Sequence, residues 1–108
     1  MEVDNNQYVG SVDRYVTDDD GNILIYVNVW GHVKNPGNHL VYEGIDLITL
    51  LSVVGGPLSG AKMNKILIYR DSEDGNGKTK YEVNLNKFYS SGDRSELVEI
   101  MPNDTIII

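Results

Sequence analysis

The stretch that decides the fold is Val27-Asn28-Val29-Trp30-Gly31-His32-Val33-Lys34-Asn35-Pro36-Gly37, a strand that runs into a turn. Two more landmarks follow it along the chain, Gly55-Gly56 and Ile66-Leu67-Ile68-Tyr69-Arg70. Glycine and proline mark turns and helix ends, and a run rich in β-branched residues is typical of a strand. In this order the landmarks enclose two strands, one short helix and a third strand.

The clearest strand covers residues 23–33 and alternates strictly between two sets of side chains. One set is Ile23, Ile25, Val27, Val29 and Val33, and the other is Leu24, Tyr26, Asn28, Trp30 and His32. A period of two predicts one buried face and one mixed face. Before this strand, residues 8–17 predict a weak edge strand, and residues 18–22 contain the Asp-Gly pair that a tight hairpin turn prefers.

The turn after this strand and the helix behind it are both marked by single residues. Residues 35–38 place Pro36 and Gly37 as the middle pair of a type II turn, so residues 39–42 are expected to form an antiparallel partner strand. Asp46 predicts a helix N-cap for an apolar stripe over residues 47–54, and Gly55 predicts a left-handed C-cap. The helix is therefore expected to have two to three turns.

The second half of the chain predicts a return to strands. The expected elements are a central strand at 65–70, a hairpin loop at 71–78, a strand at 81–85, one turn within 86–95, and short strands at 97–100 and 105–108. This order predicts an α+β fold of the β-grasp type: a mixed sheet of about five strands on one short helix, with an extra N-terminal hairpin strand. Residues 1–22 are expected to be a polar lead-in with that strand and turn, and residues 23–108 the β-grasp domain.

Composition excludes several classes of protein. A length of 108 residues suits one domain with one core. The net charge of −7 argues against a nucleic-acid partner and against an anionic lipid surface, and no apolar run approaches the roughly 20 residues that span a bilayer. Cysteine is absent, which excludes disulfides and thiolate zinc sites. The acidic start at residues 1–6 is unlike a signal peptide and fits either a cytosolic protein or a domain of a longer secreted chain.

Residues 25–108 resemble an SLBB domain, the soluble-ligand-binding β-grasp module of outer-membrane polysaccharide export proteins. The family's opening motif, Gly-x-Val-x-x-Pro-Gly after a valine-rich strand, matches Gly31 to Gly37. Its helix before Gly-Gly matches residues 47–56, and its strand ending in arginine matches residues 66–70. The closing Gly-Asp motif matches Asn103-Asp104, with asparagine in place of glycine.

The resemblance implies a non-enzymatic module of the periplasm or cell envelope that serves the export of capsular polysaccharide or exopolysaccharide. Its partners would be the polysaccharide, or neighbouring subunits and domains of the exporter, which stack into rings and so form homo-oligomers. The same fold also allows a cytosolic ubiquitin-like adaptor or an accessory domain of a redox complex. A signal peptide or lipobox upstream in the full gene would exclude that alternative.

The residues show no catalytic set, and neither a cofactor nor a metal is expected. His32 and His39 flank the Pro-Gly turn, but one histidine pair is a poor ligand set, so a surface or turn role is expected. Asp18, Asp19 and Asp20 together with Asn22 could offer oxygen ligands to a calcium ion, but the spacing of an EF-hand is missing and a solvated turn is favoured.

Tyr26, Trp30 and His32 are the candidate binding residues, because aromatic rings with polar edges suit both sugar stacking and protein interfaces. The alternative is that Trp30 completes the core against the helix. A further set is expected to build the scaffold rather than the site: Gly31, Pro36, Gly37, Gly55, Gly56, Arg70 and Asp104.

Overall fold

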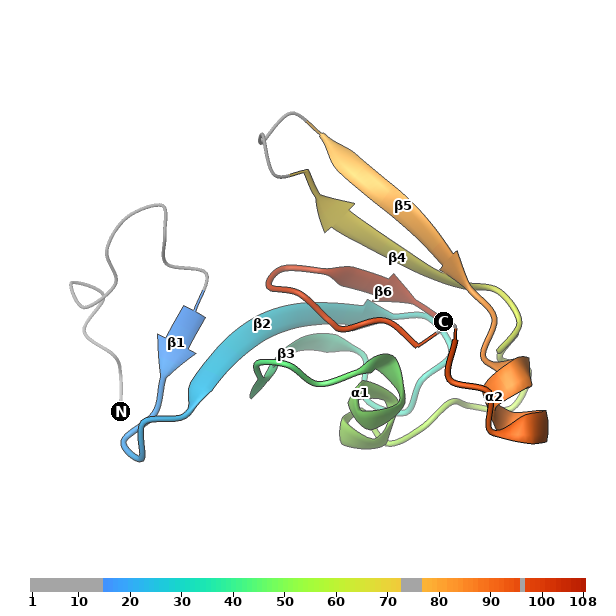
Figure 1. The fold of residues 1–108 in the computed structure, drawn as a ribbon, viewed down its shortest axis with the longest axis horizontal. Helices are drawn as coiled ribbons and strands as arrows, with labels where there is room; N and C mark the ends of the chain where they lie inside the picture. The colour runs from blue at the N-terminus through green and yellow to red at the C-terminus, as the bar shows by residue number, and fades with distance from the viewer. Residues whose placement is uncertain (1–14, 73–76, 96) are drawn as a thin grey trace.

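The computed structural model describes residues 15–72, 77–95 and 97–108, which form a six-stranded mixed sheet and two short helices (Figure 1). The elements are β1 (Tyr15–Thr17), β2 (Ile23–Trp30), β3 (Gly37–Tyr42), α1 (Leu47–Val53), β4 (Ile66–Asp71), β5 (Lys78–Val83), α2 (Asn86–Ser91) and β6 (Thr105–Ile107). This arrangement confirms the predicted α+β, β-grasp-like fold. The part of the predicted first strand over residues 8–14 lies outside the described residues. No helix in the described ranges is long and apolar enough to span a membrane.

The sheet is organised around β2 and β6. β2 pairs along one edge with β3, and along the other edge with β1 near its start and with β6 near its end. β6 runs parallel to β2 and antiparallel to β4, and β5 completes the sheet beyond β4. The order β1-β2-β6-β4-β5 therefore places the strand that comes last in sequence between two antiparallel hairpins (Figure 1).

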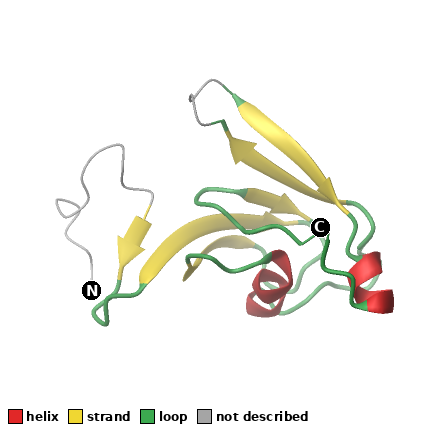
Figure 2. Ribbon diagram, in the orientation of Figure 1, coloured by secondary structure: helices red, strands yellow, loops and turns green. Residues whose placement is uncertain are grey.

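One face of the sheet forms the core, and α1 covers it (Figure 2). The fully buried side chains of β2 are Ile25, Val27 and Val29, as the alternation predicted, whereas Ile23 at the start of the strand is exposed. Leu47 and Leu50 of α1 are also fully buried. Each such side chain contributes about 2 kcal/mol through burial, and a helix this short gains its stability from packing rather than from its own hydrogen bonds.

The ends of α1 follow the predicted caps. The carboxylate of Asp46 accepts a hydrogen bond from the backbone N–H of Thr49 at 2.8 Å. Gly55 has φ 88°, and the N–H groups of Gly55 and Gly56 donate to the carbonyl oxygens of Ser52 and Leu51 at 3.2 and 2.8 Å. These two bonds form a Schellman motif, which satisfies carbonyl groups that the helix itself leaves unpaired.

The connection between β2 and β3 packs against the end of α1. Lys34 and Asn35 donate their backbone N–H groups to the carbonyl oxygens of Gly56 and Val54. A Cβ at Gly55 would lie 2.9 Å from Lys34 and Asn35 side-chain atoms, so this glycine permits the close approach as well as the helix stop. The turn after β2 and the Gly55-Gly56 pair, two of the sequence landmarks, therefore pack against each other.

Gly31 permits a second close approach, between the end of β2 and the chain beyond β6. Its φ is 97°, and a Cβ there would collide with the carbonyl oxygen of Ile108. The two segments are joined by backbone hydrogen bonds of 2.9 Å, from His32 N–H to the Ile108 carbonyl and from Ile108 N–H to the Trp30 carbonyl. Glycine at this position is required by both conformation and space.

Arg70 and Asp104 form an ion pair at the other end of β6. The Arg70 guanidinium donates to both carboxylate oxygens of Asp104, at 3.0 and 2.9 Å, and to the Glu99 carbonyl at 3.0 Å. The Asp104 side chain is fully buried, and it also accepts the N–H of Met101 at 2.9 Å. The hydrogen bonds with Asp104 raise the pKa of Arg70, and the Tyr81 ring lies 5.1 Å from its guanidinium carbon.

Several local predictions were wrong. Residues 97–100 contribute one isolated bridge, between Asp46 and Glu99, rather than a strand. Gly37 has φ 129° and pairs with Val29 as the first residue of β3, so it does not form the centre of a type II turn. The turn expected within residues 86–95 is a second helix, α2.

At the closing motif, Asn103 takes a positive φ of 65°. This left-handed conformation is tolerated by asparagine, which explains how it replaces the glycine of the motif. The turn at this point therefore does not require a glycine.

We expect the substitution Arg70→Met to lower the free energy of unfolding by about 3 kcal/mol, because it leaves the buried Asp104 carboxylate without its charge partner. Urea denaturation at pH 7 measures the change. Lys78→Met is the matched control, since it breaks the exposed Lys78–Asp71 pair and should cost less than about 1 kcal/mol. Equal losses in the two variants would contradict a structural role for the Arg70–Asp104 pair.

The N-cap of α1 should make stability dependent on pH. The hydrogen bond from the Thr49 N–H lowers the pKa of Asp46, so its contribution is present above the unfolded-state pKa of about 4 and is lost as pH falls through the folded-state pKa. We expect Asp46→Ala to cost about 1 kcal/mol at pH 7, with a smaller difference from wild type below about pH 3. Asp46→Asn retains a neutral acceptor, so its cap should not titrate. An Asp46→Ala cost that stays constant down to pH 2 would contradict this account.

Candidate functional site

The outer face of the sheet, opposite α1, carries large side chains that are exposed. Because side chains alternate along a strand, the residues that flank the buried positions all lie on this face. Its exposed apolar and aromatic members are Tyr26, Trp30, Leu40, Tyr42 and Ile107. Register places them as neighbours on adjacent strands: Tyr26 is opposite Leu40, and Trp30 is opposite Ile107.

Along β2 the outer face presents a row of three residues, Tyr26, Asn28 and Trp30. The α-carbons of Tyr26 and Trp30 are about 13 Å apart along the strand, at roughly 3.3 Å per residue. Between them, the Asn28 side-chain oxygen accepts a hydrogen bond from the Asn38 amide at 2.8 Å. We name this the Tyr26–Trp30 row: two aromatic rings with an oriented amide pair between them.

The structure places two of the three predicted binding residues in this row. Trp30 is 51% exposed, so the alternative that it completes the core is wrong. His32 is also exposed but lies beyond the end of β2, where its backbone bonds to Ile108 and Leu58. Gly31 breaks the strand between Trp30 and His32, so the three predicted residues do not form one continuous strand face.

The sequence interpretation missed the contributions of β3 and β6. Asn38, Leu40 and Tyr42 extend the outer face on one side of β2, and Ile107 extends it on the other. Alternation within residues 39–42 is a signal for Leu40 and Tyr42. Their placement beside particular β2 residues depends on register, which no single strand reveals.

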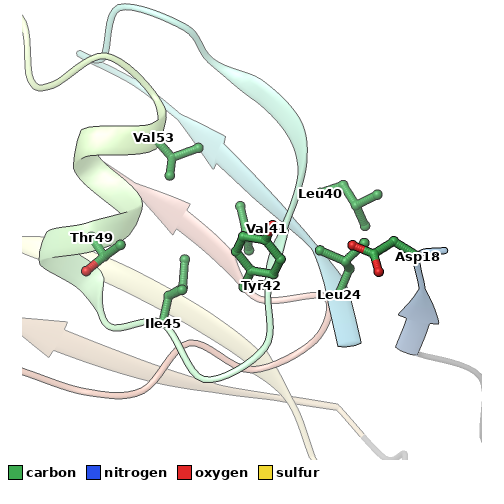
Figure 3. A pocket seen from close by; sticks show the side chains of 8 residues that line it. All are labelled: Asp18, Leu24, Leu40, Val41, Tyr42, Ile45, Thr49 and Val53. Carbon is green, nitrogen blue, oxygen red and sulfur yellow. The ribbon is translucent and has the colours of Figure 1, made fainter. Parts of the chain in front are cut away.

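A hollow of about 380 Å³ opens beside β3. In Figure 3, Ile45, Thr49 and Val53 lie to one side of Tyr42, and Leu24, Leu40 and Asp18 lie to the other. Val41 completes the lining, so the hollow reaches both faces of the sheet at the β3 edge. The one charged side chain in this lining is Asp18.

The ionisable groups with shifted pKa values in the described ranges each have a structural partner. Asp18 lies in the turn between β1 and β2, and a hydrogen bond from the side chain of Asn22 lowers the pKa of its carboxyl group. A hydrogen bond from the Ser95 N–H lowers the pKa of Asp93.

The His39 ring lies 2.7 Å from the carbonyl oxygen of Asn35, on the strand face opposite Leu40. Nowhere in the described chain do three or more histidine and carboxylate side chains gather as a metal site would need.

Comparison with known proteins identifies the family. The family model described as "SLBB domain" matches residues 26–108. A search of curated proteins returned no match to this sequence. The matched range begins within β2 and contains the Tyr26–Trp30 row, α1, the Arg70–Asp104 pair and β6. The chain therefore belongs to the SLBB domain family, the ligand-binding β-grasp modules that its glycine-proline landmarks resemble.

Proposed function

We propose that this SLBB domain is a non-enzymatic module of a cell-envelope polysaccharide export protein, and that the Tyr26–Trp30 row binds polysaccharide. The observation that carries the proposal is the exposure of both rings on an open sheet face. SLBB domains bind ligands and are common in polysaccharide export proteins, so family membership supports the same class of function. Periplasmic location and a role in capsule or exopolysaccharide export are parts of this proposal.

The chemistry of the row suits a sugar chain. The apolar faces of Tyr26 and Trp30 offer stacking surfaces, and the phenol and indole edges keep polar atoms near the ligand. The Asn28–Asn38 amide pair between them supplies a donor and acceptor whose orientation is fixed by its own hydrogen bond. A net charge of −7 favours a neutral polysaccharide over a strongly anionic one.

A second role is contact with neighbouring subunits, including copies of this domain. The observation that favours it is the pair of exposed aliphatic side chains, Leu40 and Ile107, that flank the row on either side. Aromatic residues beside aliphatic ones are also the composition of protein interfaces. A soluble oligomer that hides Trp30 would support this role.

We expect Trp30→Ala to weaken binding of oligosaccharides at least about tenfold, which corresponds to roughly 1.4 kcal/mol. The measurement is titration of the domain with a panel of neutral and anionic exopolysaccharide fragments, followed by amide chemical shifts. Tyr26→Ala should have a similar effect because both rings contact the same chain.

Tyr89→Ala is the matched control, since Tyr89 is exposed on α2, away from the row. It should leave the affinity unchanged. A panel that moves no amide resonance of β2, or a Tyr89→Ala variant that loses as much affinity as Trp30→Ala, would overturn the proposed sugar site.

A further inference from the structure

The outward edge of β3 presents backbone groups without partners in the described chain. The N–H of Glu43 donates to the carbonyl of Ile23, so residues 23 and 43 belong to the hydrogen-bonded set of this antiparallel ladder. Such pairs alternate along a ladder, so the backbone groups of His39 and Val41 are the ones that bond to β2. Asn38, Leu40 and Tyr42 therefore direct their N–H and C=O groups away from the sheet.

This edge also lacks the devices that normally protect an exposed strand. Edge strands avoid pairing with other chains through charged side chains, proline or a bulge. β5, the edge strand on the far side of the sheet, carries Lys78, Lys80 and Glu82. β3 reads Gly-Asn-His-Leu-Val-Tyr, without a lysine, a carboxylate or a proline.

The hollow lies where an added strand would place its side chains. A strand next to β3 would direct alternate side chains to opposite faces of the sheet. The hollow is lined on one side by Ile45, Thr49 and Val53, and on the other by Leu24 and Leu40 (Figure 3). Apolar side chains of the added strand would therefore contact an apolar surface on either face of the sheet.

The acidic residues around the hollow favour a basic partner. Asp18 lines it, and Asp19 and Asp20 stand in the same turn. Glu43 follows β3 directly, while neither lysine nor arginine lines the hollow. A second copy of the domain would bring a further net charge of −7, so a basic partner is favoured over self-association.

From this geometry we infer that β3 is a strand-addition site for an extended peptide segment with apolar residues at alternate positions and lysine or arginine at its ends. Backbone hydrogen bonds to Asn38, Leu40 and Tyr42 would supply affinity, and the two sides of the hollow would supply specificity. Peptide binding at this edge does not depend on polysaccharide binding by the Tyr26–Trp30 row.

The test uses a synthetic peptide of alternating valine and threonine with two lysines at each end. On addition to the domain, the amide N–H groups of Leu40 and Tyr42 should exchange with deuterium at least about tenfold more slowly. Resonances of Thr49 and Val53 should shift in the same titration. The same peptide with glutamates in place of lysines should bind several-fold more weakly because it meets the acidic rim.

Leu40→Pro removes one outward N–H and leaves the bonds between β3 and β2 in place, so it should reduce peptide affinity at least about tenfold. Lys80→Pro is the matched control and should leave peptide affinity unchanged. Ser72 and Gly77 form a hydrogen-bonded pair of the β4–β5 ladder, and such pairs alternate along a ladder, so the Lys80 N–H also points away from the sheet. If Leu40→Pro does not fold, Leu40→Lys tests the same edge with a guarding charge.

Any of these results would overturn the inference: exchange protection that is absent at Leu40 and Tyr42, a loss of affinity in Lys80→Pro equal to that in Leu40→Pro, or tighter binding of the glutamate peptide. Concentration-dependent dimerisation through β3 would also contradict it, since the occupant would then be a second copy. Trp30→Ala should leave peptide affinity unchanged, so failure of the sugar site and failure of the β3 site are separate outcomes.

Discussion

β6 joins two hairpins that do not pair with each other in the described sheet. It bonds in parallel to β2 and antiparallel to β4, and each of its ends is fixed by a different device. At its start, the buried Asp104 carboxylate holds Arg70 of β4. Just beyond its end, Ile108 bonds to the backbone on both sides of Gly31, where the absence of a side chain allows contact. The outer face and the core are both continuous because this strand is in place.

The local features of the fold could be predicted because each depends on neighbouring residues. The alternation of β2, the Asp46 cap and the Gly55-Gly56 stop each follow from a few consecutive side chains, and the structure shows all three. Residues 97–100 show the limit of this reasoning. Their apolar pattern suggests a strand, but in the structure they form one isolated bridge, between Glu99 and Asp46.

Long-range pairings could not be predicted in the same way. Arg70 and Asp104 were each recognised as scaffold residues, yet nothing in their local sequence indicates that they bond to one another across 34 positions. The same applies to the outer face. Tyr26 and Trp30 were predicted from β2 alone, whereas Leu40, Tyr42 and Ile107 join them through strand register. The sequence therefore predicted the part of the candidate face that β2 contributes, but not the parts that β3 and β6 add.

The position of β6 has a consequence for how the protein is made. Synthesis delivers β2 to β5 before Thr105–Ile107 leave the ribosome, so the central gap in the sheet is filled by the segment that emerges after them. Until then the segments of β2 and β4 that pair with β6 lack this partner, and the apolar residues beneath them lack part of their cover. Nascent chains in this interval expose the surfaces that chaperones bind and that promote aggregation. Because β6 lies between the two hairpins, this exposure lasts until Thr105–Ile107 have left the ribosome and paired with β2 and β4.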